Sequence, residues 1–281
     1  MAGILRQEVD AALALAGLRP LHRFGQNFMI DAKAVAELVA ALGAAPGMRV
    51  CEIGPGTGIL TRRLLEAGAT VLAVEIDQGL AGVLRDTLVP LGLRLEHGDC
   101  LVSKSLLHPA IIAFAATGPW RLGANLPYDV ALPVILNAAA QPCPPERIVV
   151  TIQREAAERL VSVPGHDAWG ASAAVLQAGG MPRILRRLGP SSFYPQPRVD
   201  SAILVWEPQR ALPAGFGSWC RTVFAYRRKV LPSCLVDAGW GRELGLAACA
   251  ACALDPTRRL ESLSATELVA LFTALPVLES V

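Results

Sequence analysis

The chain has 281 residues, 53% of them hydrophobic, and its 26 basic and 24 acidic residues leave a net charge of only +2. That charge by itself does not indicate a nucleic-acid partner, and the basic residues are nearly all arginine. No apolar run approaches the roughly 20 residues of a membrane-spanning helix, so we expect a soluble protein without a membrane partner. The length suits one large domain with a smaller one.

Seven scattered cysteines show no disulfide framework and favour a reducing, cytoplasmic compartment. Cys249 and Cys252 form a single CxxC pair, which on an Ala-rich helix indicates two small core residues rather than a metal or redox site. The four histidines show no metal-ligand spacing, so no metal is expected.

Residues 1–20 are predicted to form an N-terminal helical extension closed by Gly17 and Pro20. Acidic residues interrupt its apolar stretch, which favours an amphipathic helix over a secretory signal. An ordered loop follows and contains Gln26-Asn27-Phe28, which on spacing alone indicates a tether before the next helix. That helix is predicted over 32–42, with Asp31 as its cap.

A buried strand at 49–53 runs into Gly54-Pro55-Gly56-Thr57-Gly58, and a helix follows over 59–67. Strand, Gly-rich turn and helix open a Rossmann-type nucleotide fold, in which glycines let a ligand approach the backbone. The spacing is neither the dinucleotide fingerprint nor a P-loop, so a dinucleotide or phosphate ligand is not implied. Glu52 places a carboxylate beside the loop, which suits a cationic ligand.

Further acids follow the next two predicted strands. The predicted strand over 70–77 ends in two acids: Glu75 is placed to bind ribose hydroxyls, whereas Asp77 suits a helix cap. Asp99 follows a strand at 93–97 and could accept a hydrogen bond from an adenine amine.

A fourth strand leads into Asn125-Leu126-Pro127-Tyr128. The Asn side-chain oxygen and the Leu126 carbonyl can accept hydrogen bonds from a flat amine, and the Tyr ring can stack on it. A Pro-containing turn with a capping Asn is the structural alternative. Taken in order, the four strand ends describe a site for a nucleoside with a charged tail beside a flat amine, which fits S-adenosylmethionine and a methyl acceptor.

From about Arg19 to Leu275 the chain resembles the ribosomal RNA adenine dimethyltransferase family, most closely its bacterial small-subunit branch. The similar motifs, in family order, are RFGQNF (23–28), EIGPGTGILT (52–61), VEID (74–77), GD (98–99), NLPY (125–128), QREAAERLVSVPG (153–165), SSFYPQPRVDSAI (191–203), FAYRRKVL (224–231) and DPTRRLESLSATELVAL (255–271).

The resemblance implies an α/β fold: a Rossmann-like class I S-adenosylmethionine-dependent methyltransferase sheet with a small all-helical C-terminal domain. It implies dimethylation of two adjacent adenines near the 3′ end of small-subunit rRNA, in an assembling subunit, by a monomer. The cofactor residues are then Asn27, Met29, Gly54, Glu75, Asp99 and Asn125, beside Glu52 and Gly56 from the loop. The catalytic residues are Asn125, Leu126, Pro127, Tyr128 and Phe193.

Several residues depart from the family pattern. Met29 stands where Leu is usual and should do little harm, since the two are similar in size. Cys100 and Asp129 replace a common Ala and Asn, and Ala171 replaces an Arg, which weakens any RNA contact or ion pair there. Phe193 is expected to stack on the base opposite Tyr128; without the resemblance, a core aromatic is the better interpretation.

The predicted domains are the extension at 1–20, a cofactor-binding catalytic domain at 21–205 and a helical rRNA-recognition domain at 206–281. The last has 8 basic and 7 acidic residues, a net charge of about +1. Its basic cluster is predicted to contact RNA, with Arg183, Arg186 and Arg187 in support, although such a run is often a solvated face. The cluster consists of Arg221, Arg227, Arg228 and Lys229.

Two other functions compete with small-subunit dimethylation. One is a related large-subunit methyltransferase that confers antibiotic resistance. The other is a non-catalytic ribosome-assembly factor that kept the fold, which the intact Glu75, Asp99, Asn125 and Tyr128 argue against. A Rossmann dehydrogenase is excluded because no substrate-domain acid/base set follows the Gly loop.

Overall fold

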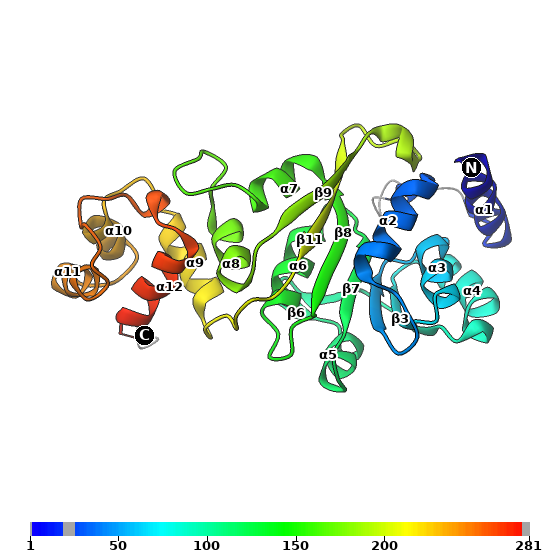
Figure 1. Cartoon of the computed structure of the whole chain (residues 1–281), viewed down its shortest axis with the longest axis horizontal. Helices are drawn as coiled ribbons and strands as arrows, with labels where there is room; N and C mark the ends of the chain where they lie inside the picture. Colours follow the sequence, from blue (N-terminus) through cyan, green and yellow to red (C-terminus); the bar gives the residue numbers. More distant parts are fainter. Residues whose placement is uncertain (1, 19–25, 277–281) are drawn as a thin grey trace. The chain divides into compact units, whose positions relative to one another are not determined.

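The computed structural model describes residues 2–18 and 26–276 (Figure 1). The chain divides into two compact units, one formed by Met1–Ala157 with Arg183–Pro208 and the other by Glu158–Pro182 with Gln209–Val281. The expected boundary at 205/206 lies close to Pro208–Gln209, where the chain last passes from the first unit to the second. The predicted boundaries placed residues 158–182 in the catalytic domain, whereas in the structure these residues belong to the C-terminal unit.

The first unit is built on a seven-stranded sheet with the order β4-β3-β2-β7-β8-β11-β9. Strands β4 to β8 in this order are parallel, and β11 is antiparallel to both β8 and β9. The central strands are buried on both faces, which explains their nearly continuous apolar sequences. The strands are β2 (Arg49–Ile53), β3 (Thr70–Glu75), β4 (Arg94–His97), β7 (Arg121–Asn125), β8 (Arg147–Gln153), β9 (Arg183–Leu188) and β11 (Ser201–Trp206).

Helices follow most of the parallel strands, as in a doubly wound α/β fold, so the predicted fold class is confirmed. Helix α2 (Ala32–Leu42) precedes β2, and the helices that follow parallel strands are α3 (Ile59–Glu66), α4 (Gln78–Thr87), α5 (Pro109–Ala116), α6 (Ala131–Ala139) and α7 (Arg154–Leu160). Two short ladders join β1 (Phe28–Met29) to β10 (Phe193–Tyr194) and β5 (Leu101–Ser103) to β6 (Leu106–Leu107). The bounds predicted for α2 and β2 agree with the structure.

The N-terminal helix α1 (Ala2–Leu15) is shorter than the predicted 1–20, and residues 19 and 20 lie outside the described ranges. It ends because Gly17 takes a positive φ of 63° and Leu18 N–H bonds back to the Leu13 carbonyl. Its apolar face packs on α3 and α4, which confirms the amphipathic interpretation.

Helix α2 is held at both ends. Asp31 caps its start, as predicted, by accepting from the N–H groups of Lys33 and Ala34. At its C-terminus, Arg121 donates to the Leu42 carbonyl at 2.5 Å and Arg147 to the Ala41 carbonyl at 2.6 Å. Because these cations come from β7 and β8 and meet the negative end of the helix, they anchor α2 to the sheet.

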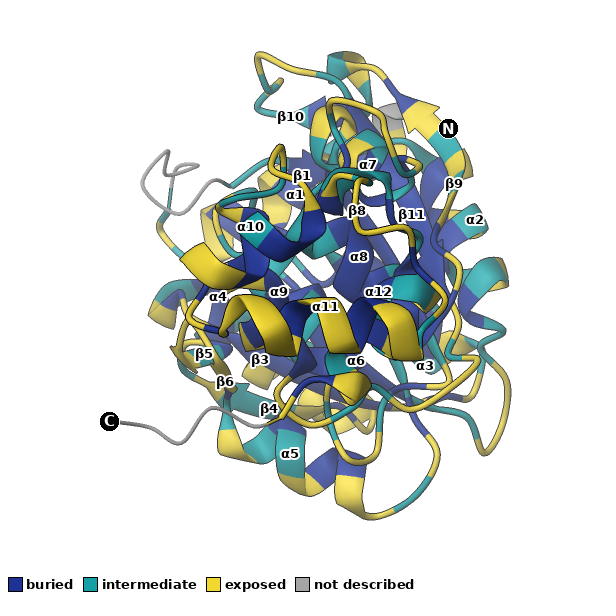
Figure 2. Ribbon diagram, turned by 90° about the vertical axis from the view of Figure 1, so that its left-hand side faces the viewer, coloured by how far each residue is buried: buried dark blue, intermediate teal, exposed yellow. Residues whose placement is uncertain are grey.

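The second unit consists of α8 (Ala171–Gly179), α9 (Phe216–Phe224), α10 (Leu231–Asp237), α11 (Arg242–Ala251) and α12 (Ala265–Ala274). Helix α8 belongs here because its almost wholly buried side chains pack on α9 and α12. Figure 2 shows α11 alternating between buried and exposed residues, and Cys249 is buried on it, as predicted, while Cys252 is partly exposed. Within the described ranges, no helix has the length and apolar character needed to cross a membrane.

Candidate active site

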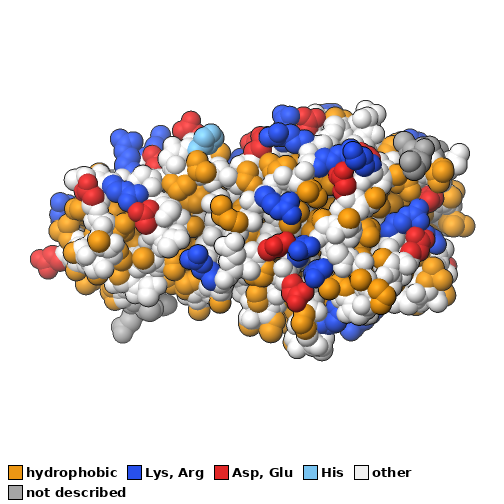
Figure 3. Space-filling model, viewed as in Figure 1, with side chains coloured by type: hydrophobic (Ala, Val, Ile, Leu, Met, Phe, Trp, Pro, Cys, Tyr) orange, Lys and Arg blue, Asp and Glu red, His pale blue; other side chains and the backbone are white. Residues whose placement is uncertain are grey.

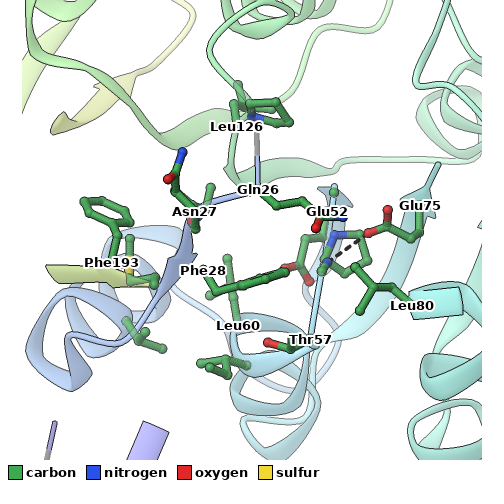
Figure 4. Close-up of a pocket in the computed structure, with 18 of the residues that line it drawn as sticks. Gln26, Asn27, Phe28, Glu52, Thr57, Leu60, Glu75, Leu80, Leu126 and Phe193 are labelled. Atoms are coloured by element: carbon green, nitrogen blue, oxygen red, sulfur yellow. Dashed lines mark hydrogen bonds between the residues drawn. The ribbon is translucent and has the colours of Figure 1, made fainter. Parts of the chain in front are cut away.

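The carboxyl ends of β2, β3 and β7 meet at a pocket in the first unit (Figure 4). This is where the edge of a parallel sheet places its ligand crevice. All but one of the predicted cofactor and catalytic residues line it: Asn27, Met29, Glu52, Gly54, Gly56, Glu75, Asn125, Leu126, Pro127, Tyr128 and Phe193.

The Gly loop and Glu75 fix one another. Gly54 and Gly56 have φ values of 63° and 58°, so both positions favour glycine. The Gly56 N–H donates to Glu75 Oε2 at 2.9 Å, and the Asp77 N–H donates to Oε1 at 2.8 Å. Burial raises the pKa of Glu75, but these backbone hydrogen bonds oppose the shift. Asp77 also caps α4, as predicted.

Glu52 lies deeper in the same pocket and is only 2% exposed. The Thr61 hydroxyl donates to its Oε2 at 2.6 Å. Burial raises the pKa of Glu52 to about 8, Thr61 opposes this shift and the neighbouring Glu75 adds to it. The sequence predicted a carboxylate that suits a cationic ligand, whereas burial favours the neutral form of this group.

Asn125 is connected to the loop that precedes α2. Its Nδ2 donates to the backbone carbonyl of Asn27 at 2.7 Å. Beside Asn27, Met29 is buried and lies opposite Phe193 in the β1–β10 ladder. The loop that spacing alone indicated as a tether therefore forms one wall of the pocket.

The Asn125–Tyr128 turn connects β7 to α6. Leu126 N–H bonds to the Thr151 carbonyl at 3.1 Å, and the Tyr128 hydroxyl lies 3.0 Å from Ser201 Oγ. The Pro-containing turn of the alternative interpretation is present, since the Val130 N–H donates to the Pro127 carbonyl. Asn125 does not cap α6, however, which begins at Ala131 with Val130 as its N-cap.

Two predicted site residues have unexpected surroundings. Phe193 is 2% exposed and belongs to the hydrophobic core, so it contributes a wall of the pocket while presenting little ring surface. Asp99 lies in a neighbouring pocket, which shares Gly54, Ile76 and Pro127 with the first one. Its Oδ1 accepts from the Leu101 N–H at 2.9 Å, and Asp129 lines the same space.

The predicted RNA-binding residues lie in the second unit and differ in their contacts. Arg221 and Arg228 are exposed. Arg227 donates to the carbonyls of Trp169 and Asp167 and pairs with Glu261, so it holds this unit together. Lys229 is paired with Asp237.

Arg186, offered in support of the RNA contact, instead forms ion pairs with Asp31 and Glu37 in the first unit. On the face shown in Figure 3, Lys and Arg are interspersed with Asp and Glu.

Sequence reasoning did not identify Thr61, Phe28 or Ser201 as site residues. Phe28 directly follows Asn27, and Thr61 ends the motif that Glu52 begins, so both residues stand inside motifs that the sequence had already marked. Ser201 begins an otherwise apolar strand and is fully buried, which is an unusual place for a hydroxyl. Within the described ranges, no cluster of His, Cys, Asp and Glu could hold a metal ion.

The parallel sheet, the Gly loop and the acids at its strand ends define a class I methyltransferase fold. Two solved structures share it: a dimethyladenosine transferase from Plasmodium falciparum (TM-score 0.71, 19% identity, 88% of this chain and 96% of that one) and the 23S rRNA methyltransferase ErmE (TM-score 0.65, 21% identity, 89% and 99%). At these identities they show the fold alone.

A family description, ribosomal RNA adenine dimethylase, matches residues 19–275. The ribosomal RNA small subunit methyltransferase A of Deinococcus radiodurans is 36% identical over 96% of this chain and 90% of its own length. The protein of the same name from Geobacter metallireducens is 33% identical over 93% and 98%. The chain therefore belongs to the ribosomal RNA adenine dimethylase family, whose members are S-adenosylmethionine-dependent methyltransferases.

Proposed function

We propose that this protein transfers methyl groups from S-adenosylmethionine to the exocyclic amines of two adjacent adenines near the 3′ end of small-subunit rRNA, during ribosome biogenesis. The main structural support for this proposal is the hydrogen bond from Asn125 Nδ2 to the Asn27 carbonyl. Because the amide nitrogen is engaged there, the amide oxygen of Asn125 is left to accept a hydrogen bond from a substrate amine in the pocket. The names of the relatives support the small subunit as the target.

The residues of the pocket fit the cofactor. Its described lining combines two carboxyl groups, Glu52 and Glu75, with apolar side chains, and no Lys or Arg is among these described residues. Such a lining suits a ligand that carries positive charge and ribose hydroxyls. Glu75 would bind the ribose of the cofactor, and Asp99 would accept a hydrogen bond from its adenine amine. Asn125 would lie between cofactor and substrate. The rest of the cofactor would contact Asn27, Met29, Gly54 and Gly56.

The bound cofactor would supply a methyl group already activated on a sulfonium. The protein then has to orient the adenine amine, which is a poor nucleophile because its lone pair is delocalised. Asn125 Oδ1 and the Leu126 carbonyl would accept hydrogen bonds from this amine and stabilise the positive charge that develops on it. Pro127 fixes the turn, Tyr128 would stack on the base, and Phe193 would support the opposite wall.

The helical unit would recognise rRNA through Arg221 and Arg228, with Arg227 and Lys229 in mainly structural positions. Because this unit carries little net charge, binding would depend on the shape of folded rRNA within an assembling subunit more than on bulk attraction. The protein would act as a monomer in the cytoplasm, where its substrate is assembled.

Methyl transfer from labelled S-adenosylmethionine tests the proposal. The purified protein would be incubated with small-subunit particles that lack adenine dimethylation and, in parallel, with large-subunit rRNA. We expect dimethyladenosine in the small subunit alone. Label in the large subunit would assign the protein to the resistance branch of the family, and cofactor binding without transfer would indicate an assembly factor.

A further inference from the structure

The two carboxyl groups of the pocket are not equally stabilised. Both oxygens of Glu75 accept backbone N–H groups, from Gly56 and Asp77. Glu52 accepts one hydrogen bond within the described chain, from Thr61, and is the more deeply buried of the two. When a buried carboxylate accepts a single hydrogen bond from a neutral donor, most of the free-energy cost of its desolvation remains uncompensated.

Thr61 is placed for this contact by rigid elements. It lies in the first turn of α3, is fully buried, and approaches Glu52 across the Gly loop at 2.6 Å. Glu52 is held on β2, between β3 and β7. Because both groups are held by rigid elements, forming the hydrogen bond between them costs little conformational entropy.

Among the described residues, no Lys or Arg lines the pocket that contains Glu52. Of the neighbouring strands, β3 contributes the like-charged Glu75 and β7 contributes Gly123 and the neutral Asn125. Helix α3 contributes Thr61, and α2 contributes Leu38 to the pocket wall. None of these described groups can balance a negative charge on Glu52, whereas a cationic ligand in the pocket can.

We propose that Thr61 is a positioning residue which prepares Glu52 to ionise when a cationic cofactor enters, so that cofactor binding releases a proton and becomes tighter as pH rises. The inference rests on the proposed use of this pocket by S-adenosylmethionine. The step balances simply: the Glu52 carboxyl loses one proton to solvent, and its carboxylate pairs with the positive charge of the ligand.

Burial raises the pKa of Glu52 to about 8, whereas Thr61 favours the ionised form. Below that pH, cofactor binding must also remove the proton, so affinity falls by up to about tenfold per pH unit until the pKa of the bound form is reached. Above it, affinity no longer depends on this group.

Calorimetric titration of the whole protein with S-adenosylmethionine, from pH 6.5 to 9 in buffers of different ionisation enthalpy, measures both affinity and proton release. We expect wild type to release more protons than Glu52→Gln at pH 7. The comparison with Glu52→Gln also corrects for protons that the ligand itself releases. Thr61→Val should bind about tenfold more weakly at pH 7.5 and recover at pH 9, and Thr61→Ser should restore the wild-type profile.

Thr151→Val is the matched control, because Thr151, on β8, is as deeply buried as Thr61 and its hydroxyl has no partner in the described chain. It should leave the pH profile unchanged. Equal proton release by wild type and Glu52→Gln, or equal profiles for Thr61→Val and Thr151→Val, would overturn the inference while cofactor binding stands. Failure of wild type to bind S-adenosylmethionine at any pH would overturn the proposed function as well.

Discussion

The side-chain nitrogen of Asn125 donates a hydrogen bond to the backbone carbonyl of Asn27 at 2.7 Å. This contact joins two segments 98 residues apart and fixes which end of the Asn125 amide remains available to a substrate. An amide can donate at one end and accept at the other, whereas a carboxylate can only accept. The pair therefore explains why an Asn, and not an Asp, is needed at this position.

Asn125→Asp should abolish most methyl transfer. Its second carboxylate oxygen would face the Asn27 carbonyl, repel it and turn the acceptor away from the adenine amine. Loss of one hydrogen bond specific to the transition state typically costs about 10²- to 10³-fold in rate. Single-turnover methyl transfer measures this loss, and the melting temperature serves as a control for folding. A variant within threefold of wild type would contradict the orienting role of Asn125.

Tyr128 and Ser201 should behave as one unit. Their hydroxyl groups lie 3.0 Å apart, and Ser201 is fully buried, so either Tyr128→Phe or Ser201→Ala removes the same hydrogen bond. We expect each single variant to raise KM for the rRNA particle, and the double variant to add little, with a coupling of about 1 kcal/mol. Steady-state kinetics of the four proteins measures this coupling. Strictly additive effects would show that Ser201 does not hold the tyrosine.

The stability of the ligand-free protein should depend on pH through the ionisation of Glu52. Burial raises its pKa from 4.5 to about 8. Between these values the folded protein holds a proton that the unfolded chain has released, so this group lowers stability as pH rises through that window. The neutral variant Glu52→Gln should therefore melt several degrees above wild type at pH 9, at about 2–4 °C per kcal/mol, and the gap should shrink towards pH 5.

Thermal melts at pH 5, 7 and 9 check this prediction. Glu146→Gln, at an exposed side chain in the same unit, is the control and should show no comparable dependence on pH. A gap between Glu52→Gln and wild type that stays constant with pH would mean that Glu52 is ionised in the folded protein throughout.

Arg227 and Arg228 are neighbours with different predicted effects. Arg227→Ala removes two hydrogen bonds to carbonyls and an ion pair with Glu261, and should destabilise the helical unit by about 1–2 kcal/mol. Arg228→Ala should leave stability unchanged, because Arg228 is exposed. Instead it should weaken rRNA binding and reduce the salt dependence of log K by about one unit.

Denaturant unfolding and filter binding at several salt concentrations separate these effects. If Arg228→Ala changed neither the affinity nor its salt dependence, the arginine would belong to an ordinary solvated face.

Local sequence determined the parallel core of this protein. Apolar runs closed by Gly or acidic residues predicted β2 and β3, and the strand-end rule placed Gly54, Glu75 and Asn125 at one pocket, because parallel strands end at the same edge. The caps at Asp31 and Asp77 were equally predictable, since a cap is a contact between residues two or three apart.

Tertiary structure decided what depends on distant neighbours. The Asn27–Asn125 and Tyr128–Ser201 contacts join segments separated by 98 and 73 residues, which no local pattern encodes. Burial of Glu52 and Phe193 changed the protonation expected for one and the exposed surface expected for the other, because desolvation is a property of the packed core. The place of α8 was also decided by tertiary packing, because its buried side chains lie against α9 and α12, far along the chain.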